Sequence, residues 1–79
     1  MSNINKYKEI FLTSLTIPEN NFKEDLKYNE IPEWDSIGHM TLISELEEKF
    51  SISFETDDIV NFSSFEEGKK ILNKMGVKL

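Results

Sequence analysis

Hydrophobic residues recur along the first part of the chain at the three- and four-residue spacing of an amphipathic helix. The first such stripe ends at Leu15 and predicts a helix over residues 3–15. From residue 16 to residue 35 the periodicity disappears, and turn formers stand at both ends, which indicates a long loop. A structureless stretch of that length in a small domain needs hydrophobic anchors. The candidate anchors are Phe22, Leu26, Ile31 and Trp34.

The clearest stripe follows the loop and predicts a second helix over residues 36–50. Asp35 and Ser36 are both suitable caps for its first turn. At about 100° per residue, the projection separates a core-facing side from an opposite side. Ile37 and Met40 project mostly away from the core, beside Ser36, so they form a small docking surface unless Met40 packs under the long loop. The residues on the core-facing side are His39, Leu42, Ile43, Leu46 and Phe50.

The segment after the second helix predicts a linker and a short helix. Residues 51–54 alternate as a strand does, but four residues without a partner strand make no sheet, so we expect an extended linker. Thr56 supplies a capping hydroxyl, and Asp57 and Asp58 supply the acidic first turn of one or two helical turns over residues 56–62. The pair of acids lacks the alternating oxygen ligands and the glycine of a calcium loop, so no metal site is expected.

A last helix is predicted near the C-terminus. Two capping boxes overlap at its start, Ser63 with Glu66 and Ser64 with Glu67, and the helix should end near Gly76. The predicted fold class is therefore all-α. We expect a small four-helix bundle with three longer helices, a short third helix and a long loop between the first two helices.

Composition narrows the functional classes for what we expect to be a single domain over residues 1–79. With 38% hydrophobic residues, the chain has enough apolar side chains for one core but not for a deep catalytic cleft as well. The absence of cysteine and the single histidine exclude disulfides, thiolate nucleophiles and Cys/His zinc sites. No apolar run exceeds three residues, so we expect no membrane span, no signal peptide and a cytoplasmic location. A binding or carrier protein is expected rather than an enzyme.

Charge is distributed unevenly along the chain. The formal net charge is −6, and residues 30–67 hold eleven acids against one lysine. This balance argues against nucleic acid and anionic lipid as partners and favours a basic protein surface. Scattered carboxylates usually mark only a solvated face, but these surround Ser36. A helix start favours a phosphate ester at that position, although a serine there often serves only as a cap.

The residues Asp35-Ser36-Ile37 and Met40, followed by Leu-Glu-Glu-Lys-Phe at the end of the second helix, resemble the acyl carrier protein family. The resemblance covers nearly the whole chain. The length and the acidity are those of the family, and the long first loop and the short third helix come in the family's order. It implies an acyl-carrier-like fold with no catalytic residue. It further implies that Ser36, supported by Asp35, accepts 4′-phosphopantetheine from coenzyme A as a covalent cofactor, whose thiol carries acyl or aminoacyl groups as thioesters.

The resemblance also implies partners. These are a magnesium-dependent phosphopantetheinyl transferase, an acyl- or aminoacyl-loading ligase, and acyltransferases or synthases with basic docking surfaces. The carrier itself is expected to be a monomer. Gly38 and His39 stand where fatty-acid carriers commonly have an acidic residue. In this respect the sequence is similar to free-standing carriers of polysaccharide or natural-product pathways. The pathway, fatty-acid or specialised, stays open. The expected docking residues, an apolar centre with an acidic rim, are Ile37, Met40, Glu47, Glu48, Asp57 and Asp58.

Two other interpretations compete with the carrier. The first is a small acidic helical adaptor in which Ser36 is only a helix cap. The second is an enzyme that uses Ser36 as nucleophile and His39 as base, and it is weak because His39 projects toward the core and no orienting acid is evident. A mass gain of one phosphopantetheine group distinguishes a carrier from an adaptor.

Overall fold

The computed structural model describes residues 2–79, and its regular structure is helical. The predicted all-α fold class is confirmed, because these residues contain four α-helices, one 3₁₀ helix and no strand longer than a single bridge. The second helix has the predicted bounds, and the first ends one residue earlier than predicted. The elements are α1 (Asn3–Ser14), η1 (Glu19–Asn21), α2 (Ser36–Phe50), α3 (Thr56–Asn61) and α4 (Phe65–Lys74).

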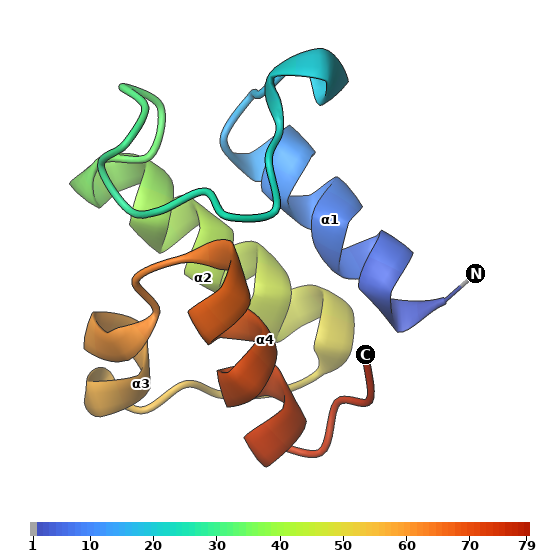
Figure 1. Cartoon of the computed structure of the whole chain (residues 1–79). Coiled ribbons are helices and arrows are strands. Elements are labelled where there is room, and N and C mark those ends of the chain that lie inside the picture. The colour runs from blue at the N-terminus through green and yellow to red at the C-terminus, as the bar shows by residue number, and fades with distance from the viewer. Residues whose placement is uncertain (1) are drawn as a thin grey trace.

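The two longest helices lie side by side, and the remaining elements close around them (Figure 1). The connection from α1 to α2 passes across the bundle and reaches the start of α4, and α4 lies in front of α2 in this view with α3 beside it. The predicted core-facing side of α2 is confirmed for the buried residues His39, Leu42, Ile43 and Leu46, and Phe50 is half-buried at its end. Among the helices of residues 2–79, none is long and apolar enough to cross a membrane.

Hydrophobic anchors hold the long loop in place, as the sequence predicts. Leu26 and Trp34 are fully buried, and Phe22 and Ile31 are half-buried against the core. Two further bonds join the loop to the start of α4. The Tyr28 N–H donates to the Ser63 carbonyl at 2.8 Å, and the Phe65 N–H donates to the Leu26 carbonyl at 2.9 Å. The loop is therefore a fixed wall of the fold beside the N-terminus of α2.

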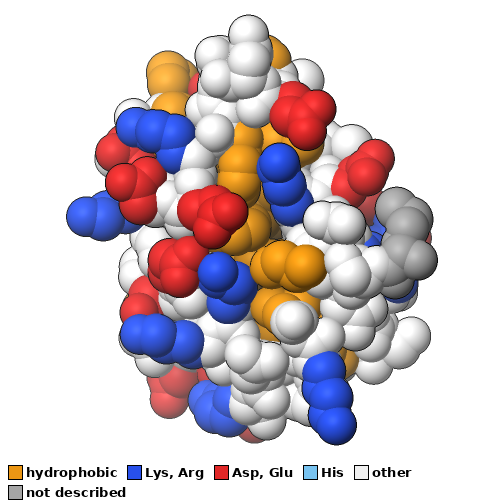
Figure 2. Space-filling model, turned by 45° about the vertical axis from the view of Figure 1, so that its right-hand side comes forward, with side chains coloured by type: hydrophobic (Ala, Val, Ile, Leu, Met, Phe, Trp, Pro, Cys, Tyr) orange, Lys and Arg blue, Asp and Glu red, His pale blue; other side chains and the backbone are white. Residues whose placement is uncertain are grey.

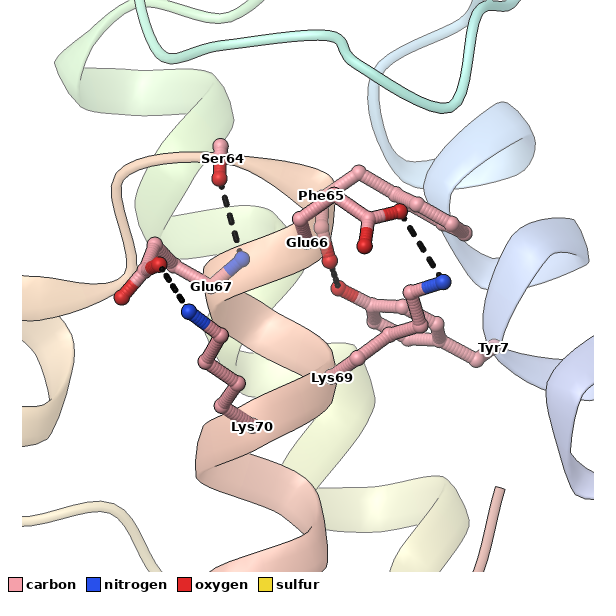
Figure 3. Close-up of polar contacts among 7 residues, drawn as sticks. All are labelled: Tyr7, Ser64, Phe65, Glu66, Glu67, Lys69 and Lys70. Atoms are coloured by element: carbon pink, nitrogen blue, oxygen red, sulfur yellow. Dashed lines mark hydrogen bonds and ion pairs between the residues drawn. The ribbon is translucent and has the colours of Figure 1, made fainter.

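Aromatic rings fill the interior between the helices. The rings of Tyr7 and Phe65 stack at 4.5 Å between centroids, and Phe11 meets Trp34 edge-on at 5.1 Å. The Tyr7 hydroxyl donates to the Phe65 carbonyl at 2.7 Å, which satisfies its only donor inside the core (Figure 3). Burial, and secondarily the charge of Glu66, raise the pKa of Tyr7 well above its ordinary value. Tyr7 is therefore a neutral, structural phenol.

The start of α4 has one of the two bonds of the later predicted capping box. The Ser64 hydroxyl accepts from the Glu67 N–H at 3.0 Å, so the later of the two serines is the cap (Figure 3). Glu67 also pairs with Lys70 at 3.0 Å, one turn further along. At α3 the predicted cap is wrong. Glu55, not Thr56, is the N-cap, because its side chain and that of Asp58 form a reciprocal capping box.

Lysine side chains cover edges of the aromatic core at the surface. The Lys6 Nζ atom lies 5.0 Å from the centre of the Phe50 ring, and Lys69 lies 5.5 Å from that of Phe65. Figure 2 shows one side of the molecule, on which hydrophobic side chains form only a narrow strip among lysines and carboxylates. The long aliphatic stems of these lysines shield apolar surface while their ammonium groups stay in water.

Candidate functional site at the start of α2

Ser36 is the first residue of α2, and it is exposed. The residue before it, Asp35, has the extended backbone of an N-cap, and its Oδ1 atom accepts from the Gly38 N–H at 2.9 Å. Asp35 therefore caps the helix, and the interpretation of Ser36 as merely a cap loses its structural basis. The Ser36 hydroxyl projects at a helix start, where free backbone N–H groups and the helix dipole favour a negatively charged substituent.

Tyr28 lies beside Ser36, and sequence reasoning missed it. The Tyr28 hydroxyl is 3.3 Å from the Ser36 Oγ atom, longer than an ordinary hydroxyl hydrogen bond, so the contact is weak. Its ring meets the rings of Trp34 and His39 edge-on, with centroids 6.0 and 5.3 Å away. No local pattern marks Tyr28, because its position depends on the loop's bond to Ser63 on a distant segment.

Gly38 lets the loop approach the first turn of α2. A Cβ atom at this position would overlap the carbonyl oxygen of Glu33 and crowd a Leu15 methyl group. Any larger residue would push the loop away from the helix, and the chain leading into Asp35 and Ser36 with it. Gly38 thus has a packing reason in this chain.

His39 is buried within the fold, and each of its ring nitrogens has a hydrogen-bond partner other than Ser36. Its Nδ1 atom accepts from the Trp34 indole N–H at 2.9 Å. Because an indole nitrogen only donates, His39 Nδ1 is unprotonated, and its Nε2–H donates to the Ile59 carbonyl at 2.9 Å. Both nitrogens of this neutral tautomer are occupied by structural bonds. The arrangement gives no support to His39 as a general base and ties the loop, α2 and α3 together.

The face of α2 next to Ser36 is apolar at its centre. Ile37 is 79% exposed and Met40 53% exposed, so Met40 does not pack under the loop. They line a shallow depression of about 510 Å³ that begins at Ser36. Its acidic edge is Glu45, which the sequence projection did not single out. Exposed large apolar side chains grouped beside one exposed hydroxyl are typical of a contact surface.

The four acids predicted for the rim lie in different environments. Glu48 on α2 and Asp57 at the start of α3 are exposed. Glu47 is half-buried, and its Oε2 atom accepts from the Phe54 N–H at 2.8 Å, so it holds the extended linker. Asp58 is buried and pairs with Lys74 at 3.2 Å. The inclusion of Asp58 in an exposed rim is therefore wrong, because its carboxylate is used inside the fold.

A second hollow lies on the other side of Tyr28. This groove, of about 260 Å³, runs between the loop and α3. Val60, at its edge, is 73% exposed. Phe62 and His39 form its buried floor. The full lining is Tyr28, His39, Ile59, Val60, Phe62 and Ser63.

Comparison with protein-family models, with curated proteins and with solved structures found no match to this chain. Within residues 2–79, no three side chains of the His, Cys, Asp or Glu types are grouped so as to hold a metal ion.

Proposed function

We propose that this protein is an acyl carrier protein that bears 4′-phosphopantetheine on Ser36 and presents thioester-bound acyl or aminoacyl groups to partner enzymes in the cytoplasm. One observation carries the proposal. Ser36 has an exposed hydroxyl at the first position of α2, while Asp35 performs the capping that would otherwise explain a serine there. The resemblance of Asp35-Ser36-Ile37 and its flanking residues to the carrier family supports the same assignment.

The surroundings of Ser36 fit the phosphodiester that this cofactor requires. The group would be attached where unpaired backbone N–H groups and the positive end of the helix dipole stabilise negative charge. The only side-chain partner of the Ser36 hydroxyl among the described residues is Tyr28, at 3.3 Å, a weak contact that a partner enzyme can displace. Asp35 is exposed and adjacent, so its second carboxylate oxygen can meet a cationic or metal-bearing partner surface.

The chemical step uses one atom of this chain. The Ser36 Oγ atom forms a bond to the phosphorus that carries pantetheine, and the bond from that phosphorus to the other phosphate of coenzyme A breaks. Adenosine 3′,5′-bisphosphate leaves, and the hydroxyl proton passes to a base of the transferase. The attached arm would supply the thiol that holds the carried groups as thioesters. The carrier supplies the acceptor oxygen and the docking surface, and the partner enzymes supply the catalysis.

The docking surface that we assign to the partners combines an apolar centre with nearby carboxylates. Ile37 and Met40 are the exposed centre, and Glu45 and Glu48 contribute negative charge on the same helix. A few central apolar side chains supply most of the energy of a small interface, while charges at the rim set association rate and partner choice. A transferase or synthase with a basic rim around an apolar cleft fits this surface.

Intact-mass measurement tests the proposal. The purified chain is incubated with a broad-specificity phosphopantetheinyl transferase, magnesium and coenzyme A, and its mass is compared with that of untreated protein. We expect a gain of one phosphopantetheine group in the native chain and none in Ser36→Ala. Ser53→Ala, which removes an exposed serine outside α2, is the matched control and should be modified normally. An unmodified native chain would leave the adaptor interpretation.

A further inference from the structure

The distance between the Tyr28 and Ser36 hydroxyls suits a phosphate better than it suits the free serine. The two oxygens are 3.3 Å apart, whereas bonds between hydroxyls are usually roughly 2.5–3.0 Å long. The separation is therefore too long for a good bond between these two groups. A phosphate on the Ser36 Oγ atom carries its non-bridging oxygens one bond further out, on the phosphorus. A donor placed at the Tyr28 hydroxyl is within reach of such an oxygen.

Tyr28 is held in place by its backbone and by its ring. Its N–H donates to the Ser63 carbonyl at 2.8 Å. The next residue, Asn29, has a left-handed φ of 67° and donates its N–H to the Trp34 carbonyl at 3.0 Å, which closes the turn. The Tyr28 ring meets the rings of Trp34 and His39 edge-on. Because the side chain is already ordered, its hydroxyl loses little conformational freedom when it binds a further group.

The charges around Ser36 leave a phosphate in need of a donor. Lys49 is the only lysine between residues 30 and 67, and it lies in the last turn of α2. At about 1.5 Å per residue, that turn is roughly 20 Å along the helix from Ser36. The neighbouring acids Glu33 and Asp35 add negative charge beside the serine. A hydrogen bond to an ionised group is roughly twice as strong as one between neutral groups, so a phenol donor contributes most at such a place.

A second hydroxyl near the start of α2, that of Thr41, is already used. Its Oγ1 atom donates to the Ile37 carbonyl at 3.1 Å, within the helix. Thr41 lines the depression at Ile37 and Met40, whereas Tyr28 does not. The two hydroxyls therefore border different parts of the surface around Ser36, and the one with a proton to give is that of Tyr28 on the loop.

We infer that Tyr28 is the positioning residue for the phosphate on Ser36. Once phosphopantetheine is attached, the Tyr28 hydroxyl donates to a non-bridging phosphate oxygen and fixes the root of the arm beside the loop. The depression at Ile37 and Met40 then stays free for a partner. The inference rests on the proposed function and adds to it the residue that sets how the arm leaves the helix. Transfer of the arm to Ser36 does not require this bond.

Carbon NMR of the holo-protein tests the inference. The chain is labelled with ¹³C at the Cζ atoms of its two tyrosines and is then modified by the transferase with coenzyme A. We expect the Tyr28 signal to shift on modification, because its Cζ atom bears the donating oxygen. The Tyr7 signal should stay in place, because the Tyr7 hydroxyl already donates to the Phe65 carbonyl. An unchanged Tyr28 signal in fully modified protein would overturn the inference and leave the carrier function intact.

Phosphorus NMR of two variants locates the effect at the phosphate. Tyr28→Phe keeps the ring and removes only the donor, so it should gain the full mass of the arm. Its phosphorus signal should move from the native position toward that of the urea-unfolded holo-protein, in which no donor is held beside the phosphate. Tyr7→Phe, the same change at the other tyrosine, should keep the native phosphorus signal.

The remaining outcomes separate the inference from the proposed function. Identical phosphorus signals in the native chain and Tyr28→Phe would contradict the role of Tyr28 while leaving Ser36 as the attachment point. If Tyr28→Phe does not fold, the Tyr28 carbon signal of the native chain decides the question alone. A native chain that gains no mass from the transferase would overturn both the inference and the carrier function.

Discussion

Asp35 and Ser36 should have opposite effects on stability and on modification. Asp35→Ala removes the acceptor of the Gly38 N–H bond and a carboxylate at the positive end of α2. Loss of such a cap costs about 1 kcal/mol, within a range of roughly 0.5–2 kcal/mol. In a domain of this size, about 1 kcal/mol lowers the melting temperature by roughly 4–8 °C. Ser36→Ala removes only a weak exposed contact with Tyr28, so its effect should stay within about 0.5 kcal/mol.

Thermal denaturation followed by far-UV circular dichroism measures both effects, with Asp35→Asn as the matched control. Asparagine caps helices as well as aspartate, so Asp35→Asn should melt close to the native temperature. The same three variants, treated with transferase, should show that only Ser36→Ala abolishes modification, while Asp35→Asn slows it. If Ser36→Ala melts as far below the native protein as Asp35→Ala does, Ser36 contributes to the cap and the separation of roles is refuted.

Three further predictions concern the core, the docking face and pH. Leu46→Ala should cost about 2–5 kcal/mol of stability because Leu46 is fully buried, whereas Met40→Ala should barely change the melting temperature yet raise the KM of the transferase for the carrier. Glu48→Lys should slow association with a basic partner, and stopped-flow measurements should show the deficit shrinking as salt is raised. The neutral Tyr7 phenol contributes stability fully below pH of about 10, and that contribution is lost as pH rises further because burial raises its pKa. Alkaline titration of the melting temperature should therefore show a steeper fall for the native chain than for Tyr7→Phe.

Each of these expectations has a result that would contradict it. A strongly destabilised Met40→Ala with unchanged partner kinetics would make Met40 a packing residue. An association defect of Glu48→Lys that does not depend on salt would remove the electrostatic argument. Parallel alkaline profiles for the native chain and Tyr7→Phe would mean that the buried phenol is not linked to folding.

Local patterns were sufficient to predict much of this fold. The stripe ending at Phe50, together with a capping residue before it, predicts the bounds of α2, because helical periodicity and capping are short-range properties. The exposure of Ile37 and Met40 follows from the same projection. The projection does not tell whether Asp35 or Ser36 caps the helix, because the cap is the residue with extended backbone angles. In the structure that residue is Asp35.

Longer-range features of the site were beyond local reasoning. Asp58 resembles an exposed first-turn acid, but α3 is oriented so that Asp58 meets Lys74 of α4 and becomes buried. Tyr28 reaches Ser36 only because the loop backbone bonds to Ser63. Both contacts depend on how separate elements pack, and no periodicity or capping motif in the sequence encodes that packing.

The most direct test of the account is to locate the modification itself. After transferase treatment, a proteolytic digest and fragment-ion mass spectrometry identify which residue bears the added group. The account predicts phosphopantetheine on Ser36 and on no other serine of the chain. A group found on another serine, or a fully unmodified Ser36 under conditions that modify a known carrier in the same tube, would contradict it.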